Sequence, residues 1–240
     1  MEAQVSASDV ARQKFVVVDI ETAPPRSSAS PTELGSAKQT SATHEITAIA
    51  VLIASRDAGP SWTVETIQSW DRSRCDEFEI LLALNRKLVG LLSAATTVVT
   101  FNGIRHDLPV IRRRAAVHRM FDLSAWASLL RCRHRDLMTD GMGGPGAQWM
   151  SLRNTCNSLL IPTESNFAKA AMATTDVARR KCETDVCSTF VLLLYTLAME
   201  AADERELVNG WHALATYTRS QHPDRPHLLQ FAYAVEDLSI

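Results

Sequence analysis

The sequence predicts one α/β domain, and three observations support this prediction. Segments rich in β-branched residues alternate with segments whose apolar residues recur at helical spacing. The chain has 240 residues, enough to bury a sizeable core within one domain. Its composition, 46% hydrophobic and 22% charged, is that of an ordinary soluble globular protein.

The predicted elements follow in order along the chain. The first three strands would form a meander, and the remaining elements alternate between helix and strand. Strands are expected at Lys14–Glu21, Glu45–Ala54, Ser61–Ile67 and around Val98 and Val99; helices are expected from about Cys75 to Leu92, after Asp107 and within Arg179–Glu200.

The first strand carries the most informative residues. Phe15–Ala23 reads FVVVDIETA, a run of β-formers that places Asp19 and Glu21 on one side of a buried strand. Two carboxylates this close repel each other unless a cation lies between them, and a divalent metal ion is the obvious candidate. The alternative is that the strand ends at Val18 and both acids are solvated loop residues.

A third acid follows the later strand. Thr96–Gly103 reads TTVVTFNG, so a β-branched strand ends in an Asn102-Gly103 turn signal, and Asp107 then begins a helix. This order places Asp107 at the carboxyl edge of the sheet, where ligands bind in open α/β folds. An acid in the first turn of a helix is also favourable without any ligand.

The fourth acid lies in the helix predicted near the end of the chain. Val186, Phe190, Leu193 and Leu197 form its apolar stripe, and Asp185 lies beside them, so a helix packed on the sheet could present Asp185 to the other acids. Glu183 would lie on another face. The alternative is a solvated acid paired with Lys181, four residues earlier.

Together these segments resemble one family, the DEDD 3′-to-5′ exonucleases of the RNase H-like superfamily. FVVVDIETA resembles the first motif, TFNGIRHDLPVIRRRA the second and KCETDVCSTF the third, in the correct order over Phe15 to about Leu197. The chain most resembles the bacterial branch related to the proofreading domain of B-family DNA polymerases. The segments Asp136–Met138 and Ser151–Pro162 also resemble the connecting region of that branch.

The resemblance implies a fold and a division of the chain. The fold would be an RNase H-like mixed five-stranded sheet flanked by helices. Residues 1–14 would be an N-terminal extension, residues 15–220 the exonuclease-like domain, and residues 221–240 a C-terminal tail. The apolar LLQFAYAV segment of that tail would pack on the domain or on a partner.

The resemblance also implies hydrolysis of the terminal phosphodiester of a single-stranded nucleic acid at its 3′ end. Two divalent cations, Mg²⁺ or Mn²⁺, would lie about 4 Å apart. Asp19 would bridge both cations, Glu21 and Asp185 would complete the site near the attacking water, and Asp107 would serve the second cation. DNA is favoured as substrate, and RNA is the alternative. The expected substrate contacts are Thr22, Asn102, Arg105 and His106.

One position departs from the family pattern. The third motif usually carries Tyr four residues before its Asp, or His five residues before it, to position the attacking water. This chain has Lys181 and Arg180 at those positions. Lys181 could orient water, hold a phosphate or, with a depressed pKa, accept a proton. Alternatively it is only an ion-pair partner, and the protein is a nucleic-acid-binding or interaction module that has lost activity.

Composition limits the partners and the compartment. The net charge of −2 means that nucleic-acid affinity must come from local basic patches. Two basic runs could supply phosphate contacts or be solvated faces: Arg105, Arg112, Arg113, Arg114 and Arg119, and Arg131, Arg133, His134 and Arg135. Five cysteines without metal-ligand spacing, no signal core and no run approaching a membrane span predict a cytoplasmic, reducing location and no membrane partner.

Two segments have the composition of loops. Ala23–His44 is rich in Pro and Ser, and it either gates the substrate or is an excursion without function. Gly141–Gln148 is rich in Gly, and it either contacts the substrate or joins two helices.

Overall fold

The structure is a computed structural model, and it describes most of the predicted domain. The described residues are 12–24, 44–57, 59–93, 95–129, 132–140, 150–163 and 175–235. The two predicted loops lie almost wholly outside these ranges, as does most of the predicted N-terminal extension.

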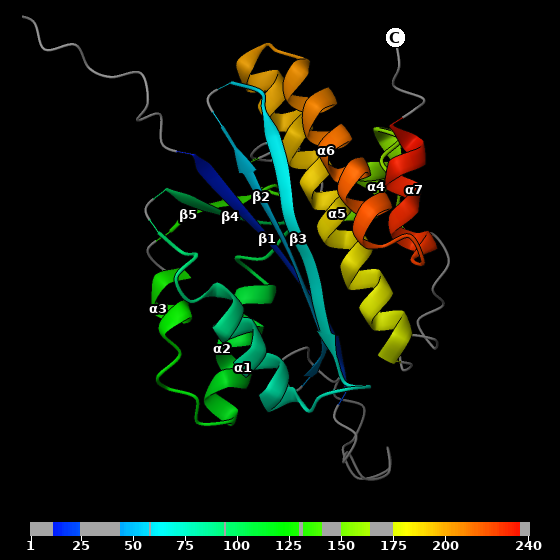
Figure 1. Ribbon diagram of the computed structural model, residues 1–240. Helices are drawn as coiled ribbons and strands as arrows, with labels where there is room; N and C mark the ends of the chain where they lie inside the picture. Colours follow the sequence, from blue (N-terminus) through cyan, green and yellow to red (C-terminus); the bar gives the residue numbers. More distant parts are fainter. Residues whose placement is uncertain are drawn as a thin grey trace, which may run out of the picture.

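A mixed five-stranded sheet forms the centre of the molecule (Figure 1). The strands are β1 (Gln13–Ala23), β2 (Glu45–Arg56), β3 (Trp62–Asp71), β4 (Thr96–Thr100) and β5 (Arg133–Asp136). Their order in the sheet is β3-β2-β1-β4-β5; β2 is antiparallel to both β1 and β3, whereas β4 is parallel to β1 and to β5. This arrangement confirms the predicted α/β fold, a mixed five-stranded sheet flanked by helices.

Helices cover both faces of the sheet (Figure 1). One face carries α1 (Glu77–Leu88), α2 (Asp107–Val117) and α3 (Ser124–Leu129); the other carries α4 (Leu152–Ser158), α5 (Thr175–Ala201), α6 (Arg205–Gln221) and α7 (Pro226–Ala234). Alternation along β1 explains the two cores, because Val16 and Val18 pack towards α1 while Phe15 and Val17 pack towards α5.

The α5 helix is the core helix of its layer. By length and composition alone Asp176–Ala201 could span a membrane, which corrects the expectation that no segment approaches such a span. However, 78% of its apolar window is buried within this fold, where it packs on β1, β2 and β3 and on α6. Packing inside the domain therefore accounts for its apolar composition.

The end of the chain, as far as residue 235, packs on the domain. Leu228, Phe231 and Ala232 on α7 are fully buried, and the Trp211 Nε1–H on α6 donates to the Phe231 carbonyl oxygen at 2.9 Å. The apolar part of the tail thus contacts its own chain.

A buried ionic network anchors α5 on the side that faces β3 and α7. Glu183 is fully buried and accepts hydrogen bonds from Arg179, Arg225 and His227 at 2.6–3.1 Å, and also from Ser69 of β3. Burial raises the pKa of Glu183, but the bonds from His227 and Ser69 and the two arginine charges outweigh burial and lower it to about 2.

Replacing Glu183 should destabilise the fold in a pH-dependent way. Because its pKa falls from 4.5 to about 2 on folding, the carboxylate contributes about 3 kcal/mol above pH 4.5, and this contribution is lost as the pH falls through 2. We expect Glu183→Gln to lower the free energy of unfolding by about that amount at pH 7, and by clearly less at pH 3, in urea titrations.

Glu200→Gln on the same helix is the matched control. Glu200 forms an exposed ion pair with Arg135, with a side chain 52% exposed, so its loss should cost less than about 1 kcal/mol. Equal losses for the two variants, or a Glu183→Gln effect that does not change with pH, would contradict the role of the network.

Candidate active site

The first two carboxylates lie at the carboxyl end of β1. The strand continues to Ala23, so the alternative in which it ends at Val18 is wrong. Asp19 and Glu21 lie opposite Ala50 and Ala48 of β2, on the face that α5 covers. Glu21 is buried, and the Asp19 Oδ2 atom is buried without a hydrogen-bond partner in the described part of the chain.

Asp185 joins this pair from α5. Asp19, Glu21 and Asp185 each contribute one carboxylate oxygen, and these three oxygens all lie within 4.8 Å of one another. Burial and then the charges of Asp185 and Asp107 raise the pKa of Asp19 well above its usual range. Such a group of hard oxygen ligands can hold a divalent cation, as the sequence pattern predicted.

Asp107 approaches the cluster from the start of α2 but is not one of the three close carboxylates. Its side chain is buried, with Oδ1 3.0 Å from His106 Nδ1 and Oδ2 buried without a hydrogen-bond partner among the described residues. Burial raises the pKa of Asp107, although the bond to His106 opposes this shift. Its charge in turn raises the pKa of Asp19, so the two groups interact.

The turn before α2 has a specific construction. Asn102 is in the left-handed region at φ 65°, and a Cβ on Gly103 would lie 2.4 Å from the Thr100 Cβ. The Asp136 carboxylate at the end of β5 accepts hydrogen bonds from the backbone N–H groups of Asn102 and Ile104, at 2.7 and 3.0 Å. Asp136 therefore positions the segment that leads to Asp107, a role the sequence motif did not reveal.

The Lys181 side chain lies between two of the carboxylates, those of Glu21 and Asp185. Its Nζ atom donates to Asp185 Oδ2 at 2.8 Å and to Glu21 Oε1. Burial lowers the pKa of Lys181, but the charges of Asp185, Glu21 and Asp19 outweigh burial and raise it. The expectation of a lysine with a depressed pKa that accepts a proton is therefore wrong, because this ammonium group is held charged.

The predicted substrate contacts lie around the same edge. Thr22 is half-buried at the end of β1, with its hydroxyl 3.4 Å from His44 Nδ1. His106 is 40% exposed, and the bond to Asp107 raises its pKa. Arg105 is exposed beside it, and Asn102 is half-buried in the turn.

The sequence also gave no signal for the contact of Cys182 with the site. Its thiol donates to the Asp19 carbonyl oxygen at 3.0 Å, and burial raises its pKa well above the usual range. Cys182 thus fastens α5 to β1 next to the cluster as an unreactive thiol.

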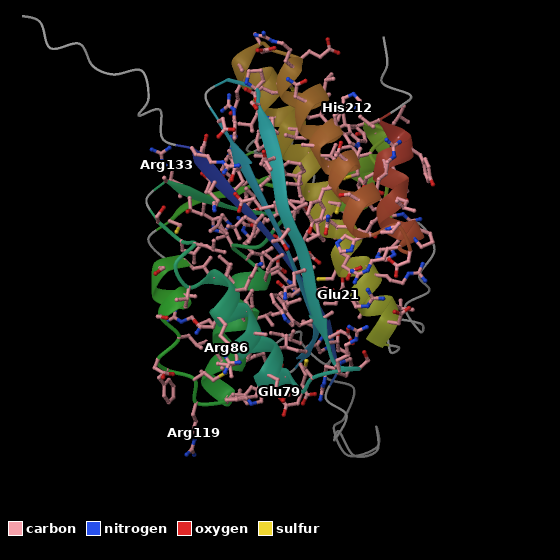
Figure 2. All side chains as sticks on the ribbon, viewed as in Figure 1. Glu21, Glu79, Arg86, Arg119, Arg133 and His212 are labelled. Carbon is pink, nitrogen blue, oxygen red and sulfur yellow. The ribbon has the colours of Figure 1, made fainter. Side chains whose placement is uncertain are left out.

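Several residues of the two basic runs form ion pairs within the fold or lie far from the carboxylate cluster. Arg114 forms a two-bond ion pair with buried Glu77, and Arg135 pairs with Glu200. Figure 2 shows Arg119 and Arg133 far from Glu21. These four residues are therefore not placed as phosphate contacts at the carboxylates, and Arg131 lies outside the described residues.

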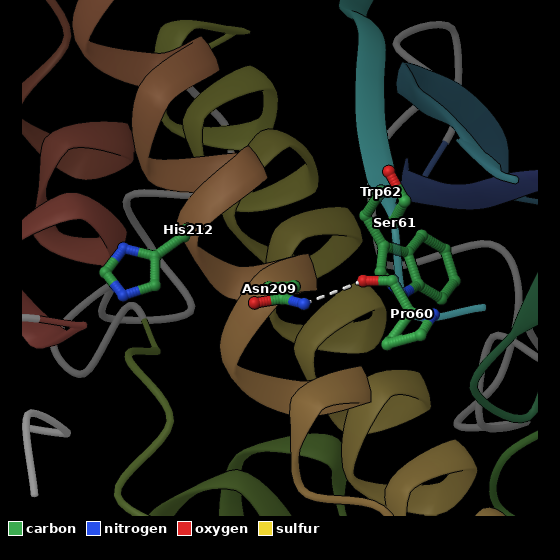
Figure 3. Close-up of a pocket in the computed structure, with 5 residues that line it drawn as sticks. All are labelled: Pro60, Ser61, Trp62, Asn209 and His212. Atoms are coloured by element: carbon green, nitrogen blue, oxygen red, sulfur yellow. Dashed lines mark hydrogen bonds between the residues drawn. The ribbon is translucent and has the colours of Figure 1, made fainter.

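A separate hollow lies at the other end of the molecule. Pro60, Ser61, Trp62, Asn209 and His212 line it, and Asn209 Nδ2 donates to the Pro60 carbonyl oxygen at 2.9 Å (Figure 3). His212 and Glu21 are well separated in Figure 2. This hollow contains none of the clustered acids, so it is not the candidate site.

The residues present fit divalent cations. Carboxylate oxygens are the ligands that Mg²⁺ and Mn²⁺ prefer, and two buried oxygens, on Asp19 and Asp107, are without hydrogen-bond partners in the part of the chain described. Buried polar atoms without partners are rare unless an ion or water satisfies them.

Fold and site together define a carboxylate site at the strand ends of a mixed α/β domain. A family model described as "Predicted 3'-5' exonuclease related to the exonuclease domain of PolB" matches residues 39–235. The chain belongs to this family, which confirms the resemblance seen in the sequence. The match begins after β1, so Asp19 and Glu21 lie outside it. A search of curated proteins finds no significant match.

Solved structures resemble the chain more distantly. The zinc-bound complex of E. coli exonuclease I with ssDNA is 14% identical with a TM-score of 0.43, over 85% of this chain and 43% of that chain. The family B DNA polymerase of Pyrobaculum calidifontis is 14% identical with a TM-score of 0.47, over 87% and 29%. The chain therefore spans less than half the length of either protein.

Gly103→Ala tests the turn that positions Asp107. The added Cβ would meet the Thr100 side chain at 2.4 Å, and the resulting overpacking should lower the free energy of unfolding by about 1–3 kcal/mol. Gly90→Asn is the control: a Cβ there meets nothing within 4 Å, so its cost should be the smaller one of a left-handed backbone, which Asn tolerates better than most residues. Urea titrations in which Gly103→Ala matches the wild type would contradict the close approach.

Proposed function

We propose that this protein is a metal-dependent 3′-to-5′ exonuclease that removes nucleotides from the 3′ end of single-stranded nucleic acid, with DNA favoured over RNA. The observation that carries the proposal is the meeting of Asp19, Glu21 and Asp185 at one sheet edge in a chain of the exonuclease family. The preference for DNA rests on the relation to polymerase proofreading domains alone.

The described residues have distinct tasks in this proposal. Mg²⁺ or Mn²⁺ held by carboxylates of this cluster would activate water and stabilise the charge on the leaving 3′ oxygen. Asp19 and Asp107 offer the unpartnered oxygens for this purpose. Thr22, Asn102, Arg105 and His106 surround the same edge and would contact the terminal nucleotide. His106 also holds Asp107 in place through Nδ1.

We propose an intracellular, reducing compartment as well. All five cysteines are free, and Cys156, Cys182 and Cys187 are buried in the core. A reducing environment suits thiols that form no disulfide.

A second candidate function has one observation in its favour. The Lys181 ammonium group satisfies Glu21 and Asp185 internally and stands where the family carries Tyr or His. A fold stabilised in this way could bind nucleic acid without cleaving it. This reading predicts binding that does not depend on metal ions.

Cleavage of 5′-labelled single-stranded DNA and RNA tests the proposal. In Mn²⁺ or Mg²⁺ we expect a ladder that shortens from the 3′ end and disappears with chelator. Asp19→Asn should lower the rate at least about a hundredfold, because changes that merely reorient a metal ligand already cost 10–100-fold.

Asp57→Asn is the matched control, since Asp57 is an exposed acid at the end of β2 that pairs with Arg12. It should cleave like the wild type. Undiminished cleavage by Asp19→Asn would contradict the proposed role of the cluster, and intact substrate with metal-independent binding would establish the second candidate function.

A further inference from the structure

The geometry points to a site in which the Lys181 ammonium group replaces one of the two divalent cations. On this inference, which rests on the proposed function, the folded protein binds a single divalent cation, held by Asp19 and Asp107. Lys181 is then an internal cation for Glu21 and Asp185.

The first observation is the position of Nζ. It contacts Glu21 and Asp185, and these two residues, with Asp19, are the three acids whose oxygens lie within 4.8 Å of one another. A cation bound by Glu21 and Asp185 would have to occupy the space that Nζ already fills. Two charge-assisted hydrogen bonds hold the ammonium group there.

The backbone supports this placement. Lys181 and Asp185 are four residues apart on α5, so they lie on one helix face above the end of β1. The opposite side of α5 is anchored through Glu183, and the Cys182 thiol bonds to the Asp19 carbonyl. The side chain of Lys181 is 28% exposed, so most of it is enclosed by this arrangement.

The second observation concerns the acids that Lys181 does not contact. Asp19 Oδ2 and Asp107 Oδ2 are buried carboxylate oxygens without hydrogen-bond partners among the described residues. Unsatisfied buried acceptors of this kind call for an external cation or water. The four acids therefore divide into a pair satisfied by the chain itself and a pair left for a ligand.

Electrostatic repulsion disfavours a second divalent cation beside the Lys181 ammonium group. A divalent cation bound beside Nζ would meet a like charge at close range in a poorly solvated site, where such repulsion is strong. Binding it would require Lys181 to give up both carboxylates. An ammonium group offsets negative charge and donates hydrogen bonds, but it does not activate water as a bound divalent cation does.

Mn²⁺ titration of the full chain, followed by electron paramagnetic resonance and calorimetry, tests the inference. Wild type should bind one Mn²⁺ and show no spin coupling between metal ions. Lys181→Gln, which removes the ammonium group, should bind two, with coupled signals from ions about 4 Å apart. This readout counts ions and does not depend on turnover.

Lys14→Gln is the matched control. Lys14 lies on β1, pairs with Glu65 and has a side chain 28% exposed, like that of Lys181, but it contacts none of the four acids. It should bind one Mn²⁺, as the wild type does. If Lys181→Gln folds poorly, Lys181→Met, which also removes the charge, takes its place, and two ions in the wild type overturn the inference without any variant.

Each other result overturns the inference. Two Mn²⁺ ions in the wild type would show that Lys181 yields its place, and one ion in folded Lys181→Gln would show that Lys181 is not what excludes the second. In both cases 3′ shortening of labelled DNA in Mn²⁺ would leave the proposed function intact. No bound Mn²⁺ together with no cleavage would overturn the proposed function as well.

Discussion

Burial of like charges side by side is the constraint on which this molecule depends. Asp19, Glu21 and Asp185 meet at the end of β1, with Asp107 close enough to raise the pKa of Asp19. Carboxylates in such a place are costly unless cations compensate them. The chain supplies one cation itself, the Lys181 ammonium group, and leaves buried oxygens on Asp19 and Asp107 for a ligand.

The scaffold holds this arrangement from several directions. The ion network around Glu183 anchors α5 on its far side, so that its near side can present Lys181 and Asp185 to β1. Asp136 fixes the turn that precedes Asp107 through backbone hydrogen bonds. In each case a buried carboxylate that accepts several hydrogen bonds holds an element that carries an acid of the site, Asp185 on α5 or Asp107 on α2.

Sequence patterns predicted the strands that are buried on both faces but not β5, the polar strand at one edge of the sheet. The strands β1 and β4 were predicted because their β-branched residues form nearly continuous apolar runs. By contrast, β5 reads RHRD, and it forms a strand only because β4 offers it backbone hydrogen bonds. The strands β2 and β3 extend beyond their predicted ends for the same reason, since pairing continues through polar residues.

The sequence by itself determined the fold class and the side of β1 on which Asp19 and Glu21 lie, because periodicity and motif order are local properties. It also placed Lys181 and Asp185 on one helix face. Only the tertiary structure decided what Lys181 does, because its partner Glu21 is 160 residues away in the chain. Of the charges that raise its pKa, that of Asp185 lies on the same helix, but those of Glu21 and Asp19 come from β1, and no local pattern could reveal them.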